Sequence, residues 1–289
     1  MIEQIISRRL RIALPQVQGT VRLLRDGATI PFISRYRKEA TGSLDEVQVG
    51  AVKEQLERLT ELESRRQTIL TTIEEQGKLT PELRRRIEEC WDPVELEDLY
   101  LPYKPKRRTR ATVARERGLE PLADLVMAQR ARDAAQQARR YVSAEVPTPE
   151  DALAGACDII AERISENEQA RNGLRRTFAR EGVVHTKVVK GKEAEGAKYS
   201  DYFDAATPLR SISSHRFLAM RRGADEGVLK ITIDIDADRC IEGLCRQFIR
   251  PGSATRTWME AAAADSFKRL MRPSIETEQL AAACLLYTS

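Results

Sequence analysis

The chain has 289 residues, of which 32% are charged and only 5% aromatic, and its formal net charge at pH 7 is +4. This length can hold two domains with a sizeable core, and the composition favours helices with solvated outer faces. Because 48 basic side chains are nearly balanced by 44 acidic ones, any affinity for nucleic acid must come from local clusters of cations. No apolar run approaches a membrane span, and the five cysteines are dispersed, so the sequence predicts a soluble cytoplasmic protein.

Helical periodicity begins at the N-terminus. Apolar residues recur at helical spacing over residues 2–14, and Pro15 is expected to end that helix. A second short helix is predicted over residues 16–26. Residues Ser43–Glu46 have the pattern of a capping box, which predicts a helix that continues to about residue 76.

Two further helix starts follow in quick succession. Thr80-Pro81 and Asp92-Pro93 each place a capping residue before a proline at the first helical position. Three capped helices close together in the sequence indicate an antiparallel helical assembly, with the periodic apolar residues forming its core.

The segment DLYLPYKPKRRTRATVARERG, residues 98–118, is the most distinctive part of the chain. From Lys104 to Arg117 it has seven basic side chains and one acid, Glu116. Its two prolines predict a loop over residues 100–106. Cations beside tyrosine rings suit a contact with a nucleic-acid backbone and its bases, but a connector with packed tyrosines and solvated charges fits equally well. The candidate contacts are Tyr100, Tyr103, Lys104, Lys106, Arg107, Arg108 and Arg110.

A second basic cluster precedes the capping box. Arg35, Arg37 and Lys38 surround Tyr36. These cations could bind phosphates, or they could form ion pairs with Glu39 and neighbouring acids. The second interpretation is preferred, because arginines often brace the junctions between helices.

The middle of the chain is also predicted to be helical. One long helix is expected over residues 119–145, followed by a break at residues 147–150. A helix over residues 166–181 is expected to place Arg171, Arg175, Arg176 and Arg180 on its outer face. Such a row could contact RNA, although it is more often a solvated surface.

A change of pattern follows residue 182. Residues 183–196 are polar and contain glycines, which is typical of a hinge between subdomains. Residues 228–236 alternate between apolar and polar side chains, which predicts a strand whose partner is residues 183–189 or lies outside the chain. A helix is expected over residues 261–271 and should end at Pro273.

The sequence contains no recognisable catalytic or metal-binding motif. Its two histidines are thirty residues apart, and there is no HExxH, GxGxxG or P-loop pattern. Asp234 and Asp236 alternate on the predicted strand as in some nuclease metal sites, but they fit the polar face of an amphipathic strand better. No enzyme activity, metal or cofactor is therefore expected.

Three parts of the sequence resemble one known family. They are IPFISRYRKEATGSLDEVQV at residues 30–49, DLYLPYKPKRRTRATVARERGLEPLADL at 98–125, and KGKEAEGAKYSDYFD with SISSHRFLAMRRGADEGVL at 190–204 and 211–229. In order and spacing they are similar to the Tex family, bacterial transcription accessory proteins that bind nucleic acid. The resemblance covers about residues 3–278. It implies a helix-turn-helix-like start, and an RNase H-like domain, helix-hairpin-helix modules and an RNA-binding S1 domain that this chain lacks.

These observations predict a mainly α-helical chain with a small mixed α/β segment. The expected regions are a helical domain at residues 1–195, a central segment at 196–278 and a tail at 279–289, which departs from the family pattern and is predicted to be non-native. The predicted function is non-enzymatic binding of RNA or DNA backbones in transcription. The alternative is a scaffold that positions the missing domains or contacts RNA polymerase, and a nuclease has the least support.

Overall fold

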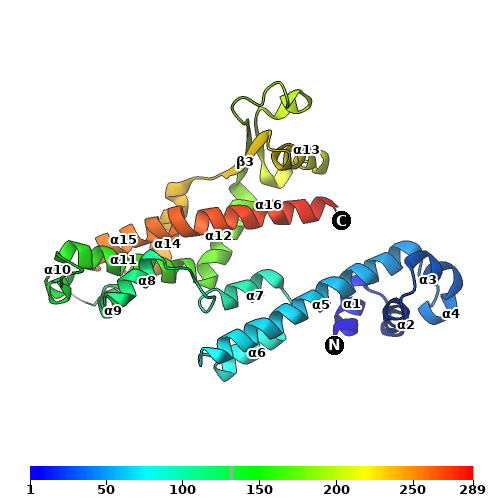
Figure 1. Ribbon diagram of the computed structural model, residues 1–289, viewed down its shortest axis with the longest axis horizontal. Helices are drawn as coiled ribbons and strands as arrows, with labels where there is room; N and C mark the ends of the chain where they lie inside the picture. The colour runs from blue at the N-terminus through cyan, green and yellow to red at the C-terminus, as the bar shows by residue number, and fades with distance from the viewer. Residues whose placement is uncertain (131–132, 289) are drawn as a thin grey trace. The chain divides into compact units, whose positions relative to one another are not determined.

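The computed structural model describes residues 1–130 and 133–288, with side chains up to residue 284. The described residues are mainly helical and include one three-stranded sheet, which confirms the predicted fold class (Figure 1). Internal contacts divide the chain into two compact units, Met1–Lys104 and Pro105–Ser289. The predicted boundary near residue 195 lies inside the second unit, between two strands that pair with each other.

The first unit is built on one long helix, α5, which packs against α1, α2 and α3 in one apolar cluster. A second cluster joins the later part of α5 to α6 and α7. The elements are α1 (Ile2–Leu10), α2 (Leu14–Arg25), α3 (Ile30–Tyr36), α4 (Lys38–Thr41), α5 (Glu46–Glu75), α6 (Pro81–Glu89) and α7 (Pro93–Tyr100).

Capping side chains close in sequence begin several of these helices. Thr80 and Asp92 cap α6 and α7 as predicted, each accepting hydrogen bonds from backbone N–H groups of the first turn. The capping box of α5 lies two residues later than predicted: the Asp45 carboxylate accepts from Gln48 N at 2.7 Å, and Gln48 Oε1 accepts from Asp45 N at 3.1 Å. Ser43 instead has a left-handed backbone with φ of 66°.

Pro15 begins a helix and does not end one. The first helix stops at Leu10, because Arg11 takes a left-handed conformation with φ of 55°. Pro15 then occupies the first turn of α2, where its missing N–H has no intrahelical partner to lose.

The second unit is organised around α11, which contacts α8, α9 and α15 and is surrounded by the largest apolar cluster (Figure 1). Its helices are α8 (Arg110–Glu116), α9 (Glu120–Ala128), α10 (Ala134–Ala138), α11 (Pro149–Ser165), α12 (Glu168–Glu181), α13 (Ser214–Asp225), α14 (Ala237–Phe248), α15 (Arg256–Asp265) and α16 (Arg272–Thr288). Short 3-10 turns are η1 (Arg139–Tyr141), η2 (Ala197–Tyr202) and η3 (Leu209–Ser211), and η4 (Ser266–Met271) is a π turn.

The sheet has the order β2-β1-β3 and is antiparallel throughout. Its strands are β1 (Val183–Val188), β2 (Asp204–Pro208) and β3 (Leu229–Asp234). The predicted strand is therefore present, and its partner is the segment after residue 182. Val184 pairs with Ile233, and both side chains are buried. The N–H of Ile233, on the edge strand, donates to Glu276 Oε1 of α16 at 2.6 Å.

Two further predictions of helix extent were wrong. The expected helix over residues 119–145 breaks after Ala128, because Gln129 takes a left-handed conformation and its side chain bonds the backbone of a distant segment. Gln129 Nε2 donates to the carbonyl of Phe248 at 2.6 Å, and Gln129 Oε1 accepts from Arg250 N at 2.8 Å. These contacts satisfy the hydrogen-bonding capacity of two backbone groups at the end of α14. They require Gln129 to leave the helical conformation, which interrupts the predicted helix.

Pro273 also fails to end its helix. The π turn η4 precedes α16 directly, so the missing N–H of Pro273 falls where the regular hydrogen-bond ladder is already interrupted. The helix α16 includes residues 279–288, where Leu280 and Ala283 are buried. Residue 289 lies outside the described residues.

Candidate nucleic-acid interface

The predicted basic segment is divided between the two units. Tyr100, Tyr103 and Lys104 belong to the first unit, and the remaining four candidates belong to the second. Tyr100 is the last residue of α7 and is only 6% exposed, and the Arg65 guanidinium lies 5.1 Å from its ring centroid. Tyr103 is half-buried, and its carbonyl accepts from Gln76 at 2.8 Å. Both tyrosines therefore have packing roles in this fold, while Lys104 is exposed.

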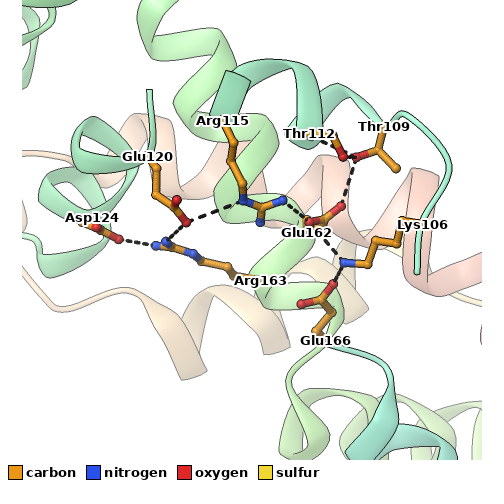
Figure 2. A network of polar contacts seen from close by, with 9 residues as sticks. All are labelled: Lys106, Thr109, Thr112, Arg115, Glu120, Asp124, Glu162, Arg163 and Glu166. Carbon is orange, nitrogen blue, oxygen red and sulfur yellow. Dashed lines mark hydrogen bonds and ion pairs between the residues drawn. The ribbon is translucent and has the colours of Figure 1, made fainter. Parts of the chain in front are cut away.

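Lys106 lies in a network of opposite charges at the end of α11 (Figure 2). Its Nζ lies 3.2 Å from Glu162 Oε1 and also forms an ion pair with Glu166. Glu162 accepts a second ion pair from Arg115 Nη1 at 2.7 Å and a hydrogen bond from Thr109 Oγ1 at 3.3 Å. The Glu162 side chain is only 8% exposed. A buried carboxylate with this many partners fixes the segment before α8 against α11.

The network continues along the same side of α11 (Figure 2). Arg163 pairs with Asp124 at 2.5 Å and with Glu120 at 3.0 Å, and both acids lie on α9. Arg115 also reaches Glu120 at 3.6 Å. Charged side chains thus connect α8, α9 and α11 in one continuous chain of contacts.

The two glutamates that share Lys106 have opposite pKa shifts. Burial raises the pKa of Glu162, but the hydrogen bond from Arg115 and the charge of Lys106 outweigh it, so the net shift is downward from 4.5. Burial also raises the pKa of Glu166, and there the ion pair with Lys106 does not offset it, so the net shift is upward. Among the described residues Arg115 forms its direct ion pair with Glu162 and not with Glu166, and the negative charge of Glu162 disfavours the ionisation of Glu166.

The other basic residues of this segment face solvent. Arg107 is exposed and has no polar partner among the described residues. Arg108 Nη2 lies 3.1 Å from Glu116 Oε2, but both side chains are more than half exposed. Arg110 is exposed at the start of α8. Burial raises the pKa of Asp158, and the nearby charge of Arg110 is among those that oppose this rise.

The second predicted cluster lies on α3 and α4. Arg35 and Lys38 are exposed and have no polar partner among the described residues. Arg37 is 3.8 Å from Glu39 in an exposed pair, and its guanidinium lies 5.6 Å from the Phe32 ring centroid. The expected ion pairing is therefore limited to one weak contact.

The predicted arginine row on α12 does not lie on one outer face. Arg171 is 5% exposed, and both it and Arg175 form ion pairs with Glu278 of α16. Arg176 and Arg180 are exposed. The prediction that the four arginines form one exposed surface is therefore wrong, because Arg171 and Arg175 connect α12 to α16.

Within the described residues, no group of three or more His, Cys, Asp or Glu side chains is placed to hold a metal ion. No helix in that part of the chain combines the length and apolarity needed to cross a membrane. Burial is the main cause of the raised thiol pKa of Cys157, about 12, and of Cys240, about 11. Thiols with such values are poor nucleophiles.

Comparison with known proteins finds two matching family models. Residues 1–74 match the Tex-like protein N-terminal domain, and residues 129–283 match the Tex central region-like family. The first match lies within the first unit and the second within the second.

Comparison with individual proteins also finds relatives in the Tex family. The chain is 47% identical over 237 residues to the transcriptional accessory protein Tex of Neisseria gonorrhoeae, covering 82% of this chain and 31% of that protein. It is 49% identical over 225 residues to Protein tex of Bordetella pertussis, covering 77% and 28%. It is 29% identical over 290 residues to the human S1 RNA-binding domain-containing protein 1, covering 93% and 28%. The chain thus spans about a third of the length of these relatives. With two helical units that each contain a matching region, the chain belongs to the Tex family and carries its N-terminal domain and central region.

Proposed function

We propose that this chain is a non-enzymatic, nucleic-acid-associated part of a transcription accessory protein that binds phosphate backbones without base specificity. Its relatives include a protein named as a transcriptional accessory protein and one named as an S1 RNA-binding domain-containing protein. The observation that carries the proposal is the exposed arginine group at the start of α8, Arg107, Arg108 and Arg110. These side chains are available to phosphates, and backbone contacts of this kind carry no sequence information.

The ion pairs of the fold divide the candidate contacts into cations that keep exposed charge and one that is neutralised inside the protein. Arg107, Arg108 and Arg110 on the second unit, and Arg35, Arg37, Lys38 and Lys104 on the first, keep exposed positive charge. Lys106 is already neutralised by Glu162 and Glu166. In this proposal Lys106 positions the segment, and the neighbouring arginines make the contacts.

The test is fluorescence anisotropy of labelled single-stranded RNA and duplex DNA with the full chain across a salt series. Each lost phosphate contact reduces the slope of log affinity against log salt by about 0.7 for single strands. Replacing Arg107, Arg108 and Arg110 with Ala should therefore flatten the RNA slope by about 2. An unchanged slope would remove this site.

A control variant removes the same amount of charge elsewhere. Lys53, Arg58 and Arg221 form exposed i,i+4 ion pairs on α5 and α13. Their triple replacement with Ala should leave the slope as in the wild type. The same labelled strands incubated with Mg²⁺ or Mn²⁺ should stay intact, and their cleavage by the purified chain would contradict the non-enzymatic part of the proposal.

The second candidate is a scaffold that positions further domains of the longer relatives or contacts RNA polymerase. The network around Glu162 favours it, because it uses cations of the basic segment for internal bracing. Absence of binding at the lowest salt, with a folded chain, would support the scaffold and overturn the binding proposal.

A further inference from the structure

The helices α12 and α14 line a groove on the second unit. One hollow of about 230 Å³ lies between the two helices, and a wider one of about 790 Å³ continues beside α12. The two hollows share Gly173 and Gln247 in their linings, so they lie side by side. Figure 1 shows both helices within the second unit.

The walls of this groove are strongly cationic. Arg176 and Arg180 come from α12, and Arg239 and Arg246 come from α14. All four are exposed, and none of the described residues that line either hollow is acidic. One carboxylate, Glu181, pairs with two of them, at 2.7 Å from Arg180 and 3.0 Å from Arg239. Arg246 has no polar partner among the described residues, so the groove keeps an excess of positive charge.

Two glycines lie in the walls where the side chains would otherwise project. Gly173 and Gly243 are interior helical residues without positive φ, and a Cβ added at either would meet no atom within 4 Å. Neither backbone conformation nor packing requires glycine, and glycine in a helix interior costs about 0.5–1 kcal/mol relative to alanine. At these two positions the absence of a side chain leaves the helix backbone open to close approach by a ligand.

The groove offers no apolar anchor for a protein partner. Its apolar wall residues Leu174, Cys240 and Leu244 are each at most 5% exposed. Cations from both helices, beside small, polar and buried apolar residues, fit a chain that carries regularly spaced negative charge. Guanidinium groups bind phosphates with two parallel hydrogen bonds, which suits a phosphodiester backbone.

We propose that the groove between α12 and α14 binds the sugar-phosphate backbone of a nucleic-acid strand. Arg176, Arg180, Arg239 and Arg246 contact the phosphates, and Gly173 and Gly243 let the strand approach the helices. This inference rests on the proposed function and adds a second contact site, separate from the arginines at the start of α8.

The test blocks the groove without removing a packed side chain. Gly243→Glu places a carboxylate among the four arginines, whereas Gly50→Glu makes the same change at an open helical position of α5 in the first unit. Binding of labelled single-stranded RNA and duplex DNA to the full chain is measured by anisotropy at low salt. Gly243→Glu should weaken binding about five- to tenfold, the loss of one or two phosphate contacts, and Gly50→Glu should bind as the wild type.

A second variant separates groove blocking from unfolding. Gly243→Ala should raise the melting temperature, because alanine favours the helix, as should Gly50→Ala. Wild-type affinity in Gly243→Glu, together with lost binding when Arg107, Arg108 and Arg110 are replaced, would overturn the groove and leave the proposed function standing. Equal weakening by Gly243→Glu and Gly50→Glu would also overturn the groove. Absence of binding by the wild-type chain would overturn both proposals.

Discussion

The guanidinium carbon of Arg66 lies 4.3 Å from the centroid of the Trp91 ring, and the Arg66 side chain is only 7% exposed. Arg66 also forms an ion pair with Glu63 and donates to the carbonyl of Glu88 at 2.5 Å. One cation thus connects the middle of α5 to the end of α6 and to the turn before α7. Such a contact combines a cation–π interaction with a hydrogen bond to the end of a helix.

Replacement of Arg66 should therefore be costly. Arg66→Ala is expected to lower the free energy of unfolding by about 2–4 kcal/mol, because it removes packing on Trp91 and leaves the Glu88 carbonyl without this donor. Arg66→Lys should lose less, since it keeps the charge but not the planar group. Urea denaturation measures both, with Arg58→Ala in an exposed ion pair as the control. A loss below about 1 kcal/mol for Arg66→Ala would contradict this role.

Glu162 should make the protein sensitive to acid. Its pKa is lower in the folded state than its ordinary value of 4.5, so its stabilising contribution is present above pH 4.5 and is lost as the pH falls through the folded value. Glu162→Gln should lack this contribution. The stability difference between the wild type and Glu162→Gln is therefore expected to shrink on acidification below pH 4.5, as measured by urea denaturation. A constant difference across this range would argue against a lowered pKa.

Glu166 should behave in the opposite way. Its folded pKa lies above 4.5, so the stability that it contributes is greatest at acidic pH and is lost as the pH rises through the folded value. Against Glu166→Gln, the wild type should therefore lose relative stability on going upward from pH 4.5. The two variants serve as controls for each other, because they remove the same group from the last turn of α11 and from the residue that follows this helix. Slopes of the same sign would contradict the opposite shifts.

Lys106 should affect stability more than binding. Its charge is paired with Glu162 and Glu166, and its side chain is 26% exposed. Lys106→Ala is expected to lower the melting temperature and to leave the salt slope of RNA binding nearly unchanged. Arg107→Ala should instead reduce the salt slope of RNA binding and leave the melting temperature nearly unchanged. A salt slope reduced equally by both variants would return Lys106 to the set of phosphate contacts.

The sequence was sufficient where a structure depends on neighbouring residues. Thr80-Pro81 and Asp92-Pro93 predicted two helix starts, because a capping side chain and a fixed proline φ act within one turn. The strand at β3 followed in the same way from its alternating pattern. These signals need no knowledge of the rest of the chain.

Other features depend on residues far away in the sequence. The break at Gln129 follows from the backbone of Phe248 and Arg250, and the burial of Arg171 follows from packing against α16. For Lys106 a partial signal was present: Glu162 and Glu166 are four residues apart, and so lie on one side of a helix. Only the fold shows that this side meets the basic segment.

The π turn η4 determines which face the last helix presents. A π turn contains about one residue more than an α turn, so the helix after it is rotated by about 100° relative to an uninterrupted one. With this rotation α16 directs Ile275 into the core and Glu278 toward Arg171 and Arg175. The turn Ser266–Met271 thus sets the rotation of α16 relative to α15, so that each helix directs its apolar face toward its own neighbours. Deletion of a single residue in this turn would rotate α16 about its axis. The side chains of α16 would then meet different partners, although the sequence of the helix would be unchanged.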